Sequence, residues 1–261
     1  MKKLIFIILM FTSQIAFAQI NVVVPYAPGG AYDNMSRKFA RFVETKMHEQ
    51  VTIENIGGAG GLLGLRKILT TPNSVAITNN NIDFLAEEKK LVLSDYQQIT
   101  LIAENPYFLA VAATSGLTCE SLRNRNKNYF IGSAGTGSGS SYPAEIVIEK
   151  YSNFTEVPYK GMSQALNDLL GKNIQIGFIT GETQQRTDLI MLANTTLQTF
   201  RGVPSWSKCL GIDKKYTGQF LMITRASSDA AFVSKMKKLV DEFIKDPDTV
   251  EYFKLNGFSR H

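Results

Sequence analysis

The chain has 261 residues, of which 44% are hydrophobic and 20% are charged, so it can bury a large core as one domain or as two lobes. Its formal net charge is +5. Without Lys2 and Lys3 the count falls to 26 basic and 23 acidic residues, a net charge of +3. This mild excess, with no basic stripe, argues against nucleic acid as a partner.

The first 18 residues have the pattern of a cleaved secretory signal. "MKK" is basic, "LIFIILMF" is apolar, and "AFA" ends a small-x-small cleavage site at Ala18. The rival interpretation is a membrane anchor, but the apolar run at 4–11 is too short to span a bilayer of about 30 Å. We therefore expect cleavage after Ala18, export to the periplasm and no transmembrane helix.

Cys119 and Cys209 are the two cysteines of the chain. An exported protein meets an oxidising compartment, which permits a disulfide between them. Their separation in space does not follow from the sequence, so a bonded pair and two free thiols both remain open. With two cysteines and two histidines the chain is poor in zinc ligands, and we expect no metal and no cofactor.

Strands, glycine turns and helices alternate along the mature chain, beginning with a buried strand at 20–26. The strand is followed by the turn Pro28, Gly29 and Gly30 and by a helix whose apolar residues share one face. Further strands are predicted at 50–56, at 74–79, on either side of Asn105-Pro106 within 97–113, at the start of 128–151, at both ends of 154–180 and at 219–225. A helix with buried residues between 232 and 243 completes the pattern.

This alternation predicts an α/β fold with mostly parallel sheets. Parallel sheets bind ligands at the carboxyl ends of their strands, which is where the glycine turns lie. The turns do not match nucleotide-binding loops. Gly58, Gly60 and Gly64 give G-x-G-x-x-x-G instead of the dinucleotide pattern, and Gly171-Lys172 lacks the Ser or Thr of a phosphate-binding loop.

The sequence also lacks a convincing catalytic serine and histidine pair of a hydrolase. Neither Ser133 nor Ser138 lies in a G-x-S-x-G elbow, and neither His48 nor His261 is well placed as a general base. We therefore expect no enzyme, although an exported hydrolase acting through Asp33 or a serine stays as an alternative. For Asp33 itself, a capping or turn-bridging role is the simpler interpretation.

The remaining interpretation is an anion site lined by backbone. Glycine turns leave amides uncovered, helix N-termini offer N–H groups without partners, and each helix dipole adds about 0.3–1 kcal/mol for an anion. Serine and threonine hydroxyls in 133–141 add uncharged donors. Lys160 lies beside one turn, but an exposed lysine is the simpler interpretation.

Four stretches also carry a family resemblance: "VPYAPGGAYD", "ENIGGAGGLLG", "IGSAGTGSGSSY" and "VPYKGMSQALNDLLGKNIQIGF". In this order they resemble motifs of the Bug family, the periplasmic substrate-binding components of tripartite tricarboxylate transporters. The resemblance extends over residues 20–181. It implies a two-lobed Venus-flytrap fold, with a cleft between α/β lobes and a hinge motion that closes them.

The resemblance further implies a monomer that captures a small carboxylate or amino acid and delivers it to an integral membrane permease. We expect lobe 1 at 19–113 plus 221–261 and lobe 2 at 114–220, with crossings near 110–116 and 216–222. The ligand-binding residues carried over are Tyr26, Ala27, Pro28, Gly29, Gly30, Asp33, Asn79, Ser133, Ala134, Gly135, Thr136, Gly137, Ser138, Tyr159, Lys160 and Gly161.

The chain also departs from the family pattern. Tyr142-Pro143 stands where the family often has a histidine, "DLIMLANTT" replaces a Lys-x-Arg-Ala-Leu-Ala segment, and the chain is short. These departures lie in the second lobe and leave the identity of the ligand open. A sensor that docks on a membrane receptor and a member without a ligand therefore remain alternatives.

Overall fold

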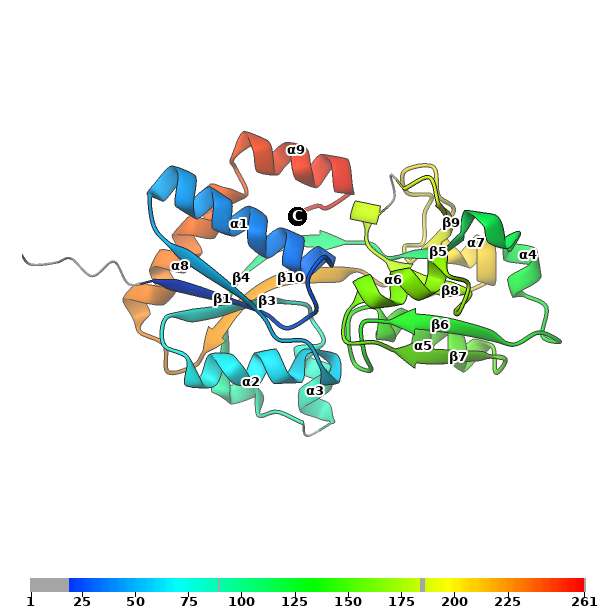
Figure 1. Ribbon diagram of the computed structural model, residues 1–261, viewed down its shortest axis with the longest axis horizontal. Coiled ribbons are helices and arrows are strands. Elements are labelled where there is room, and N and C mark those ends of the chain that lie inside the picture. Colours follow the sequence, from blue (N-terminus) through cyan, green and yellow to red (C-terminus); the bar gives the residue numbers. More distant parts are fainter. Residues whose placement is uncertain (1–18, 89, 184–185, 261) are drawn as a thin grey trace, which may run out of the picture.

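The computed structural model describes residues 19–88, 90–183 and 186–260, which form two α/β lobes side by side (Figure 1). The expected signal peptide at 1–18, with its cleavage site, lies outside these residues, as does His261. Within the described stretches, no helix is both long enough and apolar enough to cross a bilayer.

Lobe 1 is built on a five-stranded sheet in the order β2-β1-β3-β10-β4. Its strands are β1 (Ile20–Val24), β2 (Val51–Asn55), β3 (Ser74–Thr78), β4 (Tyr96–Asn105) and β10 (Gly218–Arg225). Its helices are α1 (Ala31–Met47), α2 (Leu62–Thr70), α3 (Ile82–Glu87), α8 (Ala230–Phe243) and α9 (Pro247–Asn256).

Both faces of this sheet are covered, because successive side chains of a strand point to opposite faces. Ile20, Val22 and Val24 of β1 are buried in the core under α1, α8 and α9. Val23 packs on the other face, in the core formed with α2 and α3. Figure 1 shows α1, α8 and α9 on one side of the sheet and α2 and α3 on the other. A strand covered on both faces explains why the apolar residues at 22–24 are consecutive in the sequence.

Lobe 2 repeats this plan with the strand order β7-β6-β8-β5-β9. Its strands are β5 (Phe108–Ala112), β6 (Tyr129–Ser133), β7 (Phe154–Pro158), β8 (Ile176–Ile179) and β9 (Leu189–Asn194). Its helices are α4 (Cys119–Leu122), α5 (Ser141–Lys150), α6 (Met162–Leu170) and α7 (Trp206–Leu210). Helix α6 covers one face of the sheet, and α5 and α7 cover the other.

The expected α/β fold with mostly parallel sheets is confirmed, but each sheet is mixed, because one strand runs against the other four. In lobe 1, β10 is antiparallel to both β3 and β4, and in lobe 2, β5 is antiparallel to both β8 and β9. The cause is the path of the chain. Strands β5 and β10 each enter their lobe from the other one, so they begin at the cleft, whereas their neighbours end there.

The expected lobe boundaries are wrong by a few residues at both crossings. Residues 108–112 are expected in lobe 1 but form β5 of the second sheet, and β10 begins at Gly218 in the first sheet. The first crossing is therefore Pro106-Tyr107, where proline has no N–H to continue the ladder of β4. The second crossing lies just before Gly218, within the expected range of 216–222.

Thr195, fully buried, ties the two crossings together. Its amide donates to the carbonyl of Tyr107 at 2.9 Å, and its hydroxyl accepts from the amide of Tyr107 at 3.0 Å. The same hydroxyl donates to the carbonyl of Tyr216 at 2.8 Å, whose amide donates back to Thr195 at 2.9 Å. Both connections between the lobes thus lie side by side, an arrangement that suits a hinge.

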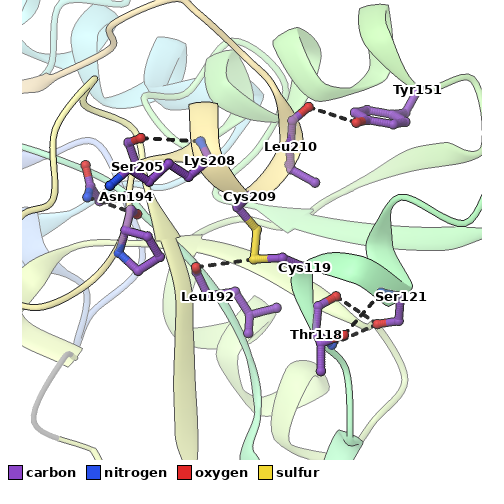
Figure 2. The surroundings of a disulfide bond; sticks show 11 residues. Thr118, Cys119, Ser121, Tyr151, Leu192, Asn194, Ser205, Lys208, Cys209 and Leu210 are labelled. Atoms are coloured by element: carbon purple, nitrogen blue, oxygen red, sulfur yellow. Dashed lines mark hydrogen bonds between the residues drawn. A yellow bond between two sulfur atoms is a disulfide. The ribbon is translucent and has the colours of Figure 1, made fainter.

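A disulfide joins Cys119, at the start of α4, to Cys209 in α7 (Figure 2). The question that the sequence left open is thereby answered, since neither thiol is free. The two cysteines are 90 positions apart in the sequence, and the bond between them lies wholly within lobe 2. It therefore restricts the unfolded chain without restraining the movement of one lobe against the other.

Replacing both cysteines by serine should lower the free energy of unfolding by about 2–4 kcal/mol, because the unfolded chain gains the entropy of an open loop. Urea denaturation of the double variant measures this loss. The wild-type protein treated with a reducing agent is the control and should lose a similar amount. Equal midpoints for the oxidised, reduced and double-variant proteins would contradict a stabilising disulfide.

Candidate functional site

A cavity of about 270 Å³ lies between the two lobes. It is lined in lobe 1 by Tyr26, Gly29, Gly30, Ala31, Tyr32, Asn34 and Asn79, at the first crossing by Tyr107, and in lobe 2 by Ala134, Ser138, Gly139, Ser140, Met162, Ser163, Leu166, Phe178, Ile179, Thr180, Glu182 and Arg186. Most of these residues follow the carboxyl ends of β1, β3, β6 and β8, as expected for sheets of this kind. Small-molecule pockets span about 300–1,000 Å³, so this cavity suits a small ligand.

Helix N-termini from both lobes meet at the cavity. Helix α1 begins at Ala31 behind the N-cap Gly30, and α5 begins behind the N-cap Ser140. Both caps line the cavity, together with Met162 at the start of α6. The first N–H groups of a helix have no partner within it, and the helix dipole is positive at that end. The amides of Ser141 and Tyr142 already donate to Ser138, and Pro143 has no N–H, so α5 offers an anion its dipole rather than free amides. Backbone donors come from the first turn of α1 on the opposite side.

Asp33 fixes the turn in front of α1. Its carboxylate accepts hydrogen bonds from the amide of Gly29 at 2.9 Å, from Arg37 at 2.9 Å and from Asn55 at 2.9 Å. Burial alone would raise the pKa of Asp33, but the hydrogen bonds from Arg37, Gly29 and Asn55 outweigh it and hold the pKa below its usual value. Asp33 does not line the cavity. These hydrogen bonds show that Asp33 anchors the turn, which is the turn-bridging role considered from the sequence.

Several amides that the sequence suggested as free donors already have partners inside the protein. The amide of Gly29 donates to Asp33. The others are bonded as follows: Ala27 to the carbonyl of Lys160 at 3.4 Å, Ala134 to the hydroxyl of Ser140 at 2.9 Å, Gly135 to the hydroxyl of Ser133 at 3.2 Å and Ser138 to the carbonyl of Gly135 at 2.9 Å. The glycine turns are thus held rigid by their own hydrogen bonds.

Glycines instead allow the lobes to touch. A Cβ on Gly60 of lobe 1 would lie 2.2 Å from the carbonyl oxygen of Thr136 in lobe 2. A Cβ on Gly161 of lobe 2 would lie 2.7 Å from the Cβ of Ala27 in lobe 1. Beside them, the hydroxyl of Ser163 donates to the carbonyl of Pro28 at 2.9 Å. Backbone meets backbone here, so the lobes are closed around the cavity.

The sixteen expected site residues therefore divide into two groups. Those that line the cavity are Tyr26, Gly29, Gly30, Asn79, Ala134 and Ser138. Those that do not are Ala27, Pro28, Asp33, Ser133, Gly135, Thr136, Gly137, Tyr159, Lys160 and Gly161. Several of the second group form the contact between the lobes, while the side chain of Lys160 is exposed and Tyr159 donates to Asp168 at 2.6 Å.

Buried tyrosines lie along one side of the cavity. The rings of Tyr26 and Tyr32 have centroids 4.8 Å apart, and the Tyr32 hydroxyl lies 3.5 Å from that of Tyr107. Asn79 donates to the hydroxyl of Tyr26 at 2.9 Å. Burial raises the pKa of all three phenols, to about 12 for Tyr107. They consequently remain protonated hydroxyls at neutral pH.

Glu182 is the main residue that the sequence analysis missed. Asn34 donates to one of its carboxylate oxygens at 3.0 Å, and the hydroxyl of Tyr252 donates to the other. Burial raises the pKa of Glu182 from 4.5 to about 7, opposed by the bond from Asn34 and reinforced by the charge of Asp33. A signal was present, because "IGFITGE" places Glu182 just beyond the carboxyl end of a predicted strand.

A hydrolytic site lacks its usual base. Among the described residues that line the cavity, none is a histidine or a cysteine. His48 caps the C-terminal end of α1, while the N-terminal end of this helix of 17 residues meets the cavity, about 25 Å away at 1.5 Å per residue. The arrangement is chemically suited to binding.

Replacing Asp33 by Ala should lower the free energy of unfolding by about 1–3 kcal/mol, because the Gly29 amide and Asn55 lose a buried acceptor. Arg37→Ala is the matched control and should cost less, since the bonds to Gly29 and Asn55 remain. Urea denaturation of both variants tests this. A loss for Asp33→Ala below about 0.5 kcal/mol would show that the carboxylate is not what holds the turn.

The pKa of Glu182 predicts a pH-dependent difference in stability. Between pH 4.5 and 7 the folded protein retains a proton that the unfolded chain releases, so the wild-type unfolding free energy falls as pH rises through this window. Glu182→Gln lacks this loss, and its melting temperature minus that of the wild type should therefore increase with pH. Calorimetry without ligand measures the difference. Glu54→Gln, at an exposed carboxylate, is the control; equal slopes for the two variants would contradict the prediction.

The comparison with known proteins agrees with a binding site between two lobes. A model of the tripartite tricarboxylate transporter family receptor matches residues 35–261. A UPF0065 protein in the TAR-I ttuE-ttuC' intergenic region of Agrobacterium vitis is 25% identical over 256 residues, which covers 90% of this chain and 73% of that relative.

Solved structures show the same fold. Periplasmic binding protein BugD has a TM-score of 0.84 at 23% identity, with 92% of this chain and 87% of that chain covered. MatC (Rpa3494) from Rhodopseudomonas palustris, with bound malate, has a TM-score of 0.82 at 16% identity, with 93% and 90% covered. The Bug-family resemblance of the four motifs is confirmed, and this protein belongs to the tripartite tricarboxylate transporter receptor family.

Proposed function

We propose that this protein is a solute-binding receptor that captures a small carboxylate between its lobes and delivers it to a membrane permease. The observation that carries the proposal is the cavity between the lobes onto which the N-termini of α1 and α5 converge. A carboxylate placed there would accept hydrogen bonds from first-turn amides of α1 and would be favoured by the dipole of α5. Both lobes would then hold the same anion, so binding would favour the closed state.

The carboxylate of the ligand would be recognised by neutral groups. First-turn amides after Gly30 would bind the carboxylate, and the hydroxyls of Tyr26 and Ser138 and the amide of Asn79 would add donors or acceptors. The remaining glycine-turn residues, including Thr136 and Gly161, would serve closure of the lobes. A malate-bound neighbour of the same fold supports a carboxylate of this size.

The family and the fold support periplasmic action. The basic, apolar and small-residue pattern of 1–18 supports removal of the leader after Ala18. In this scheme the closed, liganded protein, as a monomer, presents a surface that the open form lacks, and the permease reads that surface. The protein binds and releases its ligand without catalysis and without nucleic acid.

Thermal unfolding of residues 19–261, refolded to remove bound ligand, tests the proposal against a panel of dicarboxylates, tricarboxylates, aromatic acids and amino acids. A ligand at 100 times its dissociation constant should add about 2.7 kcal/mol to the unfolding free energy and raise the melting temperature. A folded protein whose melting temperature responds to no member of the panel would overturn carboxylate capture.

Gly161→Ala tests whether closure is part of binding. Its backbone is extended (φ 177), so alanine is tolerated locally, but the new Cβ would meet Ala27 of the other lobe at 2.7 Å. The variant should bind the panel's best ligand at least about tenfold more weakly, with a nearly unchanged melting temperature without ligand. Gly171→Ala, at the far end of α6, is the matched control and should bind normally. Equal affinities for the two variants would contradict closure at this contact.

A further inference from the structure

The carboxyl group of Glu182 lies at a cavity whose other features favour an anion. It lies just beyond β8, lines the cavity and is held by two residues of the opposite lobe, Asn34 of α1 and Tyr252 of α9. Both donors are neutral. The carboxylate is therefore fixed in position by hydrogen bonds, but these bonds do not compensate its charge.

Among the described residues, three cations of the neighbouring elements have other partners. Arg186, at the cavity wall, donates twice to Asp188, at 2.8 and 2.6 Å. Arg37 of α1 is bound to Asp33 at 2.9 Å. Lys38 lies over the ring of Tyr252, with its Nζ 5.0 Å from the ring centroid.

Glu182 is half-buried, and no ion pair to it is formed by the residues that the structure describes. Withdrawing a carboxylate from water in this way is costly, and the raised pKa of Glu182, caused first by burial, expresses that cost. A ligand can change this balance. A second carboxylate beside Glu182 would repel it, whereas an ammonium group would supply the missing opposite charge and form charge-assisted hydrogen bonds.

We propose that the ligand is an amino carboxylate, whose carboxylate faces the N-termini of α1 and α5 and whose ammonium group binds Glu182. This inference rests on the proposed function and names the class of carboxylate that the cavity selects. Glu182 is the residue that distinguishes an amino acid from a hydroxy acid or an unsubstituted acid of the same shape.

The spacing of the two ends supports this ligand class. Gly30 caps α1, and Asn34, which holds Glu182, lies about one helical turn further along, a rise of about 5–6 Å. The ammonium and carboxylate of a small amino acid, each with a hydrogen bond of about 3 Å to its partner, can span a distance of this order. In a cavity of about 270 Å³ one such molecule can reach both ends.

The test compares matched ligands on the refolded mature protein by calorimetry at pH 7. The probes are the protein amino acids together with their 2-hydroxy and unsubstituted counterparts, which differ only in carrying an ammonium, a hydroxyl or a hydrogen. We expect at least one amino acid to bind at least about tenfold more tightly than both of its counterparts. Glu182→Gln should abolish that preference by weakening the amino acid alone, whereas Glu54→Gln, on the surface, should retain it.

The outcomes separate this inference from the proposed function. Tight binding of carboxylates without any preference for the ammonium group would overturn the inference and leave carboxylate capture standing. Full retention of the preference by Glu182→Gln would overturn the inference in the same way. If the wild-type protein bound neither the amino acids nor the other carboxylates, carboxylate capture itself would fail, and the inference with it. If Glu182→Gln does not fold, the affinities of the wild-type protein for the amino acids and for their counterparts still test the inference.

Discussion

Backbone contact between the lobes is the constraint on which the site depends. Gly60 meets the carbonyl of Thr136, and Gly161 meets Ala27, with no room for a Cβ at either place. These contacts bring helix α1 of one lobe and helix α5 of the other to a single cavity. The glycines of the sequence motifs consequently act mainly by letting the lobes approach, and only some of them reach the ligand space.

Once the lobes are closed, the cavity acquires two electrostatic ends. The N-termini of α1 and α5 provide partial positive charge, and Glu182 provides a carboxylate whose protonation is sensitive to what lies beside it. Because Glu182 is bonded to Asn34 and Tyr252 of the other lobe, this second end is assembled by closure as well. Ligand recognition and lobe closure are thus parts of one event in the scheme proposed for this receptor.

The disulfide stabilises one lobe, whereas the hydrogen bonds of Thr195 hold the hinge between the lobes. The disulfide between Cys119 and Cys209 stays inside lobe 2, so it stabilises that lobe without opposing closure. Thr195 instead holds the two crossings at Tyr107 and Tyr216 against each other with neutral hydrogen bonds. The movement needed for binding can therefore be confined to a narrow hinge while each lobe keeps its core.

The sequence by itself determined the local elements and the family, because apolar runs, glycine turns and helix starts such as that at Ala31 are set by nearby residues. It also identified part of the cavity lining, for example Gly30 and Ser138. It also marked Pro106 as a break, although not as the crossing between lobes. Only the tertiary structure decided which amides were already bonded, which way β5 and β10 run, that Cys119 pairs with Cys209 and that Glu182 faces the cavity. Each of these depends on residues far apart in the chain, and their proximity is created by the packing of two lobes, which no local pattern encodes.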